Sequence, residues 1–375
     1  MRQNEEKVVR KMSSGLRAKL QAIAPGNAAR AAMPERGGLV VRTDRRKAPE
    51  GLLSLPGRGL ERLGAGAGFS VEKCLFLDTE TTGLSGGAGT VAFLVGAAWV
   101  EGEELVTEQY ILGDHSDEPE MLLRLSELLK RFDTAVTFNG KAFDIPLLES
   151  RYTICRLRDH WRALYQLDLL PPARRVWKLR LQSCRLSNLE ARVLGVRREN
   201  DLPGSEAPER FFRYLQTGDF SLLEEVIAHN LQDVVTLAVL LVKLARLFDE
   251  PLTATDSRDR YSLGRALEKR GDMQAAEVYA LSRDVPEGSY RLYVLYRRAG
   301  EWERARAVLE AMVRKNQLGY IPHIELAKLY EHHDKNCRRA LFYTKIALAM
   351  CEGPEREAII HRRDRLERKL SRGGN

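Results

Sequence analysis

Two acidic residues interrupt an apolar run that otherwise has the composition of a buried strand. The stretch LFLDTETTGLSGGAGTVAFLVG, residues 75–96, carries Asp78 and Glu80 two positions apart and then breaks into threonines and glycines. Side chains two positions apart on a strand face the same side of a sheet. Because buried carboxylates are costly unless something neutralises them, the fold has to bring partners or cations to this strand.

The pattern around this stretch predicts a mixed α/β domain. Apolar runs indicate strands at 74–80, 90–102, 104–112 and 134–140, and the second and third are expected to form a hairpin. Helical spacing of apolar residues indicates helices at 117–132, 141–154 and 219–248. We therefore expect a mixed five-stranded sheet flanked by helices.

The ends of the chain differ from this centre. Residues 1–70 contain 14 Lys and Arg against six acids, so they account for the whole net charge of +8. Residues 1–68 are rich in Gly, Ala, Arg and Pro, and we expect a basic, largely flexible segment there. Such a segment either strengthens nucleic-acid binding or is simply solvated. The α/β domain is expected to span 69–250, followed by a helical domain at 256–372.

The C-terminal part contains related helical segments. GDMQAAEVYA and GEWERARAVL place Ala276 and Ala305 at matching positions, and a third segment places Ala340 there. The spacings of 29 and 35 residues lie near the ~34 residues of tetratricopeptide repeats, which this all-α region resembles. Such repeats often present a binding groove for a protein partner. A plain helical cap on the first domain explains the pattern equally well.

Cysteine usage and hydropathy indicate in which cellular compartment the protein is expected. The five cysteines are scattered without a CxxC pair, which favours reduced thiols in a cytoplasmic protein. No apolar run approaches the roughly 20 residues of a membrane span, and the N-terminus has no apolar signal region. We expect a cytoplasmic protein without a membrane partner.

Two further acids are candidates to join the first pair. Asp144 lies in FNGKAFD at a strand-to-helix transition, and Asp233 lies in HNLQD on the long helix, four residues after His229. Four carboxylates from three elements would repel one another unless cations neutralised them, and two Mg²⁺ or Mn²⁺ ions would do so. Taken singly, Asp144 also fits a helix N-cap, Asp233 a surface acid and His229 a core histidine.

These motifs resemble the DEDD exonuclease superfamily, which has a ribonuclease H-like fold. DTETTGL, FNGKAFDIPLL and HNLQD occur in the order of its three motifs, and the second has the form seen in exonuclease domains of family B DNA polymerases. The middle phrases resemble the narrower group of YprB-type predicted exonucleases. The resemblance implies that the metal ligands are Asp78, Glu80, Asp144 and Asp233. It also implies that His229 positions or deprotonates the attacking water.

The resemblance suggests substrate contacts as well. By motif position, Thr81 would contact the 3′ end and Leu84 would wedge against a base, whereas Asn139 binds substrate or caps the strand end. A basic track at 174–185 that includes Trp177 suits a phosphate backbone with a stacked base, or a solvated helix face. His229 departs from the superfamily, because it has the H-x3-D spacing usual for tyrosine members.

The implied function is a two-metal-dependent nuclease. The expected reaction is 3′–5′ exonucleolytic hydrolysis of single-stranded DNA or RNA, which releases nucleoside monophosphates. Two alternatives remain open: an endonuclease that acts on structured nucleic acid with the same metal site, and a protein-binding repeat scaffold whose nuclease domain is degenerate.

Overall fold

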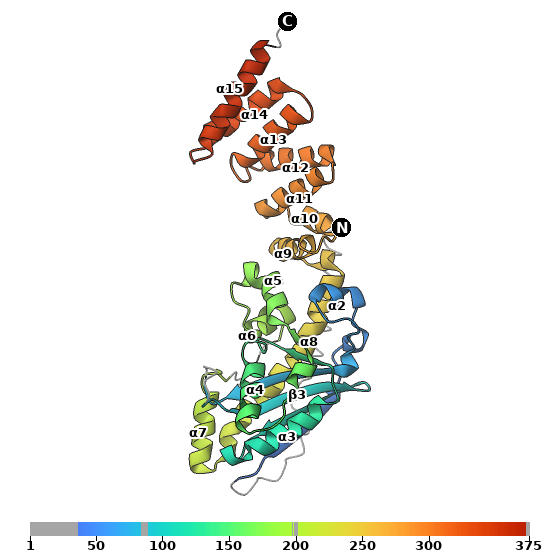
Figure 1. The fold of residues 1–375 in the computed structure, drawn as a ribbon, viewed down its shortest axis with the longest axis vertical. Coiled ribbons are helices and arrows are strands. Elements are labelled where there is room, and N and C mark those ends of the chain that lie inside the picture. The colour runs from blue at the N-terminus through green and yellow to red at the C-terminus, as the bar shows by residue number, and fades with distance from the viewer. Residues whose placement is uncertain (1–36, 84–88, 197, 199–201, 373–375) are drawn as a thin grey trace. The chain divides into compact units, whose positions relative to one another are not determined.

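The computed structural model describes residues 37–83, 89–196, 198 and 202–372 (Figure 1). These residues form two compact units that divide between Glu250 and Pro251. The first unit contains a sheet with helices, and the second contains only helices among its described residues. No helix among the described residues is both long enough and apolar enough to cross a lipid bilayer.

The sheet of the first unit has six strands in the order β1-β4-β3-β2-β5-β6. The pairs β1–β4, β4–β3 and β3–β2 are antiparallel, whereas β2–β5 and β5–β6 are parallel. The predicted mixed sheet is thus confirmed, but the expected count of five strands was wrong. The strands are β1 (Val40–Lys47), β2 (Cys74–Thr81), β3 (Ala92–Glu101), β4 (Glu104–Ile111), β5 (Thr134–Thr137) and β6 (Tyr165–Asp168).

Helices cover both faces of this sheet (Figure 1). On β3, Trp99 packs against Phe132, just beyond α3 (Glu118–Leu129), with ring centroids 6.0 Å apart. Gly96 lies three positions before Trp99 and therefore faces the other side of the strand. It abuts α8 (Glu224–Asp249), where a Cβ atom on Gly96 would lie 2.1 Å from Oδ1 of Asn230. A glycine at this point lets α8 approach the sheet closely.

Structured elements also occur within the N-terminal segment that was expected to be largely flexible. For residues 37–68 that expectation was wrong, because β1 adds an edge strand to the sheet and α2 (Gly57–Leu63) packs along α8. The basic residues serve as partners in the fold. Arg42 pairs with Glu224 at 2.6 Å, and Nη1 of Arg62 donates to the carbonyl of Phe248 at 2.9 Å. Residues 1–36 lie outside the described residues.

The predicted helices of the first unit occur close to their expected positions, as α3, α4 (Asp144–Ile154) and α8. Trp177 is 1% exposed and packs in the interior, so its suggested role in stacking a base was wrong. The remaining elements are η1 (Leu52–Ser54), η2 (Val71–Lys73), η3 (His115–Asp117), η4 (Trp161–Ala163), α5 (Leu170–Leu181), α6 (Leu186–Leu189), the π-helical turn η5 (Glu190–Leu194), α7 (Ala207–Thr217) and η6 (Phe220–Leu223).

The second unit is a succession of helices, each in contact with the next. Ala305 and Ala340, two of the small residues at matching positions, are fully buried, whereas Ala276 is half-buried. The buried carboxylate of Glu331 on α13 receives Arg362 and Arg365 from α15. The elements are η7 (Pro251–Thr253), α9 (Ser257–Glu268), α10 (Ala275–Ala280), α11 (Pro286–Arg298), α12 (Trp302–Arg314), α13 (Ile321–His332), α14 (Cys337–Met350) and α15 (Arg356–Arg372).

Candidate active site

The four carboxylates singled out in the sequence lie in one electrostatic neighbourhood. Asp78 and Glu80 project from β2, Asp144 is the first residue of α4, and Asp233 lies on α8. Burial raises the pKa of Asp78 well above its usual range, and the charges of the other three acids raise it further. Three separate elements therefore bring these acids close enough to repel one another.

The pKa values of the other three acids are also raised, with burial as the largest cause in each case. Burial, followed by the charges of Asp233 and Asp144, raises the pKa of Glu80 to about 8. Burial raises the pKa of Asp144 to about 6, although its hydrogen bond from Thr79 opposes the rise. Burial also raises the pKa of Asp233, against the lowering effects of Arg198 and His229. Each of the four carboxyl groups is thus harder to ionise than usual.

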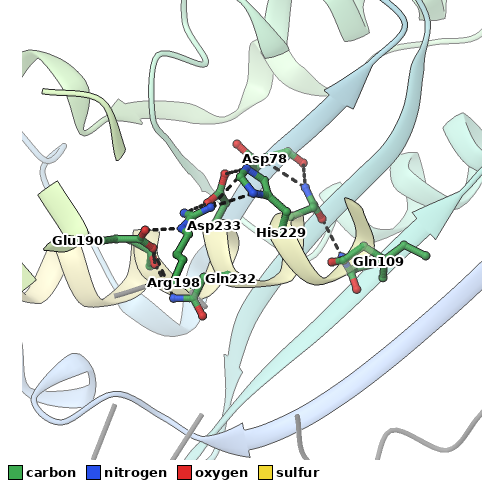
Figure 2. Close-up of polar contacts among 10 residues, drawn as sticks. Asp78, Gln109, Glu190, Arg198, His229, Gln232 and Asp233 are labelled. Atoms are coloured by element: carbon green, nitrogen blue, oxygen red, sulfur yellow. Dashed lines mark hydrogen bonds and ion pairs between the residues drawn. The ribbon is translucent and has the colours of Figure 1, made fainter. Parts of the chain in front are cut away.

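A chain of buried amides fixes the position of Asp78 (Figure 2). Nδ2 of Asn230, on α8, donates to Oδ2 of Asp78 at 3.0 Å. Oδ1 of Asn230 accepts a hydrogen bond from Nε2 of Gln109, on β4, at 2.9 Å, and the same nitrogen donates to the carbonyl of Ile227 at 2.8 Å. Because Asn230 is fully buried and uses both ends of its amide, it orients the carboxylate rigidly.

Asp144 and the loop before it depend on two other polar groups. The hydroxyl of Thr79 donates to Oδ1 of Asp144 at 2.5 Å. Asp168, at the end of β6, accepts the backbone N–H groups of Asn139 at 2.8 Å and Leu170 at 2.9 Å. Asn139 has a φ of 72°, a left-handed conformation that asparagine tolerates better than most residues. Asp168 therefore holds the loop that leads into Asp144.

Asp233 has cationic and imidazole neighbours (Figure 2). Nη2 of Arg198 donates to Oδ1 of Asp233, and Nε2 of His229 lies 3.5 Å from Oδ2 of the same carboxylate. Nη1 of Arg198 lies 3.0 Å from Nδ1 of His229. Because a guanidinium has only donors, a ring nitrogen that accepts from it carries a lone pair. The 3.5 Å distance between His229 and Asp233 shows that the two side chains share one face of α8, as their four-residue spacing predicts.

The predicted substrate-contact residues have different surroundings. Thr81 is buried and its hydroxyl donates to the carbonyl of Gly83 at 2.8 Å, while the β2–β3 register shifts between Glu80 and Thr81. Such a bulge frees backbone groups from strand pairing. The side chain of Asn139 is exposed. Leu84 lies outside the described residues.

The chemistry of this donor set fits hard divalent cations. Four carboxylates supply oxygen ligands of the kind that Mg²⁺ and Mn²⁺ prefer, and burial raises the pKa of each, so that a bound cation would favour their ionised forms. Among the described residues, no group of three or more His, Cys, Asp or Glu side chains is arranged to hold a metal ion.

Several residues of the site were not identified from the sequence. Asn230 lies inside the HNLQD motif, where an amide that could bond an acid was visible, yet its partner Gln109 is 121 residues away. The sequence offers little reason to select Arg198, which is one arginine among many. It offers little reason to select Asp168, which is the acid at the end of a short strand-like run. These four residues, Asn230, Gln109, Arg198 and Asp168, all act through contacts that depend on the tertiary fold.

Comparisons with known proteins agree with this architecture. Residues 75–245 match the model of the RNase_H superfamily. The chain is 32% identical over 329 residues to "Uncharacterized protein YprB" of Bacillus subtilis (strain 168), a match that covers 84% of this chain and 79% of that protein.

A solved structure of the family B DNA polymerase from the hyperthermophilic archaeon Pyrobaculum calidifontis is also similar, with a TM-score of 0.37 and 15% identity. The match covers 52% of this chain and 29% of the polymerase chain, and a likeness at this level fixes no activity. From the superfamily match and the relationship to YprB, we conclude that the chain carries an RNase H-like domain and belongs to the same protein family as YprB.

Proposed function

We propose that this protein is a two-metal-dependent nuclease that degrades single-stranded DNA or RNA from the 3′ end and releases nucleoside monophosphates. The observation that carries the proposal is that three elements place Asp78, Glu80, Asp144 and Asp233 in one buried region, where burial raises the pKa of each and the charges of Asp144 and Asp233 further raise those of Asp78 and Glu80. The RNase_H superfamily match supports it, since the matched residues include all four acids. The direction of degradation rests on the motif resemblance.

The four carboxylates would hold two Mg²⁺ or Mn²⁺ ions. When bound, such ions activate a water and stabilise the leaving oxygen of a phosphodiester. Asn230 and Thr79 would keep the carboxylates of Asp78 and Asp144 in fixed orientations through their 3.0 Å and 2.5 Å hydrogen bonds. Fixed ligands reduce the reorganisation that metal and substrate binding would otherwise require.

His229 is suited to accept the proton of the attacking water. Asp233 lies beside the ring and would stabilise the resulting cation, while the contact with Arg198 would have to be released before the nitrogen that it engages takes a proton. The water oxygen bonds to phosphorus as the bond to the preceding 3′ oxygen breaks. The products are a nucleoside monophosphate and a strand shortened by one residue.

The chain end would lie beside Thr81. Its hydroxyl is engaged with Gly83, so the backbone at the β2 bulge is the better candidate for contact with a terminal 3′ hydroxyl. The exposed Asn139 side chain and Leu84 complete the proposed substrate contacts.

For the second unit, we propose a tetratricopeptide-like array that binds a protein partner. Support comes from the sequential helix contacts and from the burial of Ala305 and Ala340 at matching positions. The proposed nuclease domain was expected at 69–250, but β1 and α2 belong to the same fold, so its described residues begin at 37; the array spans 256–372.

A panel of labelled substrates tests the proposed activity. Linear single-stranded DNA and RNA, each labelled at either end, and circular single-stranded DNA are incubated with Mg²⁺ or Mn²⁺. The proposal predicts mononucleotide release from the 3′-labelled end of at least one linear strand, with the circular strand left intact. Cutting of the circle would favour the endonuclease, and no hydrolysis of any substrate would contradict the nuclease proposal.

Near-isosteric variants locate the activity. Asp78→Asn and Asp233→Asn each remove a carboxylate oxygen ligand while keeping the side-chain shape, and we expect a loss of at least about 100-fold in rate. Asp133→Asn is the matched control, because Asp133 is exposed and lies just before β5. Equal rates in the two site variants and the control would place the reaction elsewhere.

A further inference from the structure

A buried guanidinium lies among the acids of the candidate site. The side chain of Arg198 is 9% exposed, and its ion-pair partners Glu190 and Asp233 are 1% and 13% exposed. Its charge lowers the pKa values of Asp233 and Glu80 against the larger effect of burial. Arg198 is therefore a source of positive charge that partly neutralises the acids in the absence of metal.

A second carboxylate, that of Glu190, binds the Nε side of this arginine. Nε of Arg198 donates to Oε2 of Glu190 at 2.5 Å, while the hydroxyl of Thr236 and the amide of Gln232 donate to Oε1 of Glu190 (Figure 2). Because Gln232 and Thr236 belong to α8, the helix that carries Asp233, the anchor is part of the site's own frame. Glu190 thus holds one edge of the guanidinium and leaves the edge with Nη1 and Nη2 directed at His229 and Asp233.

The edge of Arg198 that carries Nη1 and Nη2 would meet two different anions in turn during the proposed reaction. Here that edge binds Asp233, whose carboxylate oxygen would otherwise be available to a divalent ion. If a divalent ion were held by that carboxylate, Arg198 would give up Asp233, and its bond to Glu190 would keep it at the site. A planar guanidinium is well matched to a phosphate group, and the nucleic-acid substrate of the proposed reaction would bring one to this site.

We propose that Arg198 is a further functional residue of the site: it occupies Asp233 as an internal counter-cation until metal binds, and it then contacts the substrate phosphate. This inference rests on the proposed function. Its consequence is a pair of opposite effects. Removal of Arg198 should tighten metal binding, since a competing cation is gone, and should weaken the reaction of the loaded enzyme, since a phosphate contact is gone. A purely structural arginine would weaken both.

The test measures both properties in full-length Arg198→Gln. Calorimetric titration with Mn²⁺ should give a Kd lower than that of the wild type by about tenfold. At saturating Mn²⁺, kcat/KM on the 3′-labelled single strand should fall by about tenfold or more. Arg192→Gln is the matched control, because Arg192 is exposed on the η5 turn that begins with Glu190, and it should change neither value.

A double variant tests whether misfolding of Arg198→Gln, or its change in net charge, could account for the result. Glu190→Gln with Arg198→Gln leaves no unpaired carboxylate at position 190 and keeps the net charge of the wild type, and it should show the same two opposite shifts. Weaker or unchanged Mn²⁺ binding in both Arg198 variants would overturn the inference while leaving the metal site intact. If the wild type bound no Mn²⁺, the inference and the proposed function would both fail.

Discussion

At the residue scale, the site is defined by acids that are difficult to ionise together. Asp78, Glu80, Asp144 and Asp233 all have raised pKa values, with burial as the main cause in each case. A protein gains no stability from four neighbouring carboxylates in a partly buried place, because each ionisation opposes the next. Their presence together therefore supports the proposal that the site binds cations.

These raised pKa values predict an unusual dependence of stability on pH. The pKa of Glu80 is about 8 in the folded chain against an ordinary value of 4.5, so between these pH values the folded state holds a proton that the unfolded chain has released. The free energy of unfolding should therefore rise as the pH falls from about 8 to about 4.5, by up to about 1.4 kcal/mol per pH unit for one such proton.

Thermal unfolding in EDTA across this pH range measures the effect, and Glu80→Gln isolates the contribution of Glu80. The variant should be more stable than the wild type at pH 8, and the difference should vanish near pH 4.5. Saturating Mn²⁺ should reduce the dependence in the wild type, since cations favour the ionised carboxylates. A pH dependence in EDTA identical for the wild type and the variant would contradict the pKa assigned to Glu80.

Residues that act through local motifs could be predicted from the sequence, whereas those that act through distant partners could not. Asp78 and Glu80 were identifiable because the strand period places them on one face, and His229 and Asp233 because the helical period does so. Arg198 became visible only after folding, since its partner Asp233 is 35 residues away and nothing local distinguishes it from other arginines.

At the element scale, the distance between α8 and the sheet decides where Asp233 lies relative to Asp78. Gly96 permits this distance, because the space its Cβ atom would fill is taken by Asn230. Asn230 in turn bonds Asp78 across the gap. The glycine, the amide and the acid thus link the strand pair β2–β3 to the helix.

Gly96→Ala should disturb both the packing and the site. The new methyl group would force Asn230 or α8 to move, with an expected loss of about 1–3 kcal/mol in the free energy of unfolding and weaker Mn²⁺ binding by calorimetry. Gly57→Ala is the control, because a Cβ atom there would have no neighbour within 4 Å. Unchanged stability and unchanged Mn²⁺ affinity in Gly96→Ala would show that neither the fold nor the metal site depends on the close approach of α8 to the sheet.

Elements with continuous apolar runs were predictable, and the ones missed have polar sequences. β3 has nine buried residues in succession and was recognised as a strand. β1 was missed because VVRTDRRK has the composition of a basic tail. It forms a strand because β4 offers an edge with which it pairs over eight residues, and because acids such as Glu224 receive its arginines. Such compensation depends on distant segments.

At the scale of the whole molecule, the chain combines an RNase H-like domain with a helical unit. The change of sequence texture after Pro251 indicated this division, because the strand pattern stops and helical spacing continues alone. The similarity to YprB covers 84% of the chain, so it extends beyond the superfamily match at 75–245. The nuclease proposal concerns the first unit, and the proposed protein partner concerns the second.

The central claim is that the four carboxylates hold divalent ions, and anomalous diffraction at the manganese absorption edge tests it most directly. Crystals of the full-length protein soaked in Mn²⁺ should show two anomalous peaks among Asp78, Glu80, Asp144 and Asp233, roughly 3.5–4 Å apart. Crystals of Asp78→Asn should lose at least one of them. The absence of any anomalous peak between these carboxylates in wild-type crystals, at Mn²⁺ concentrations that support catalysis in solution, would contradict the account.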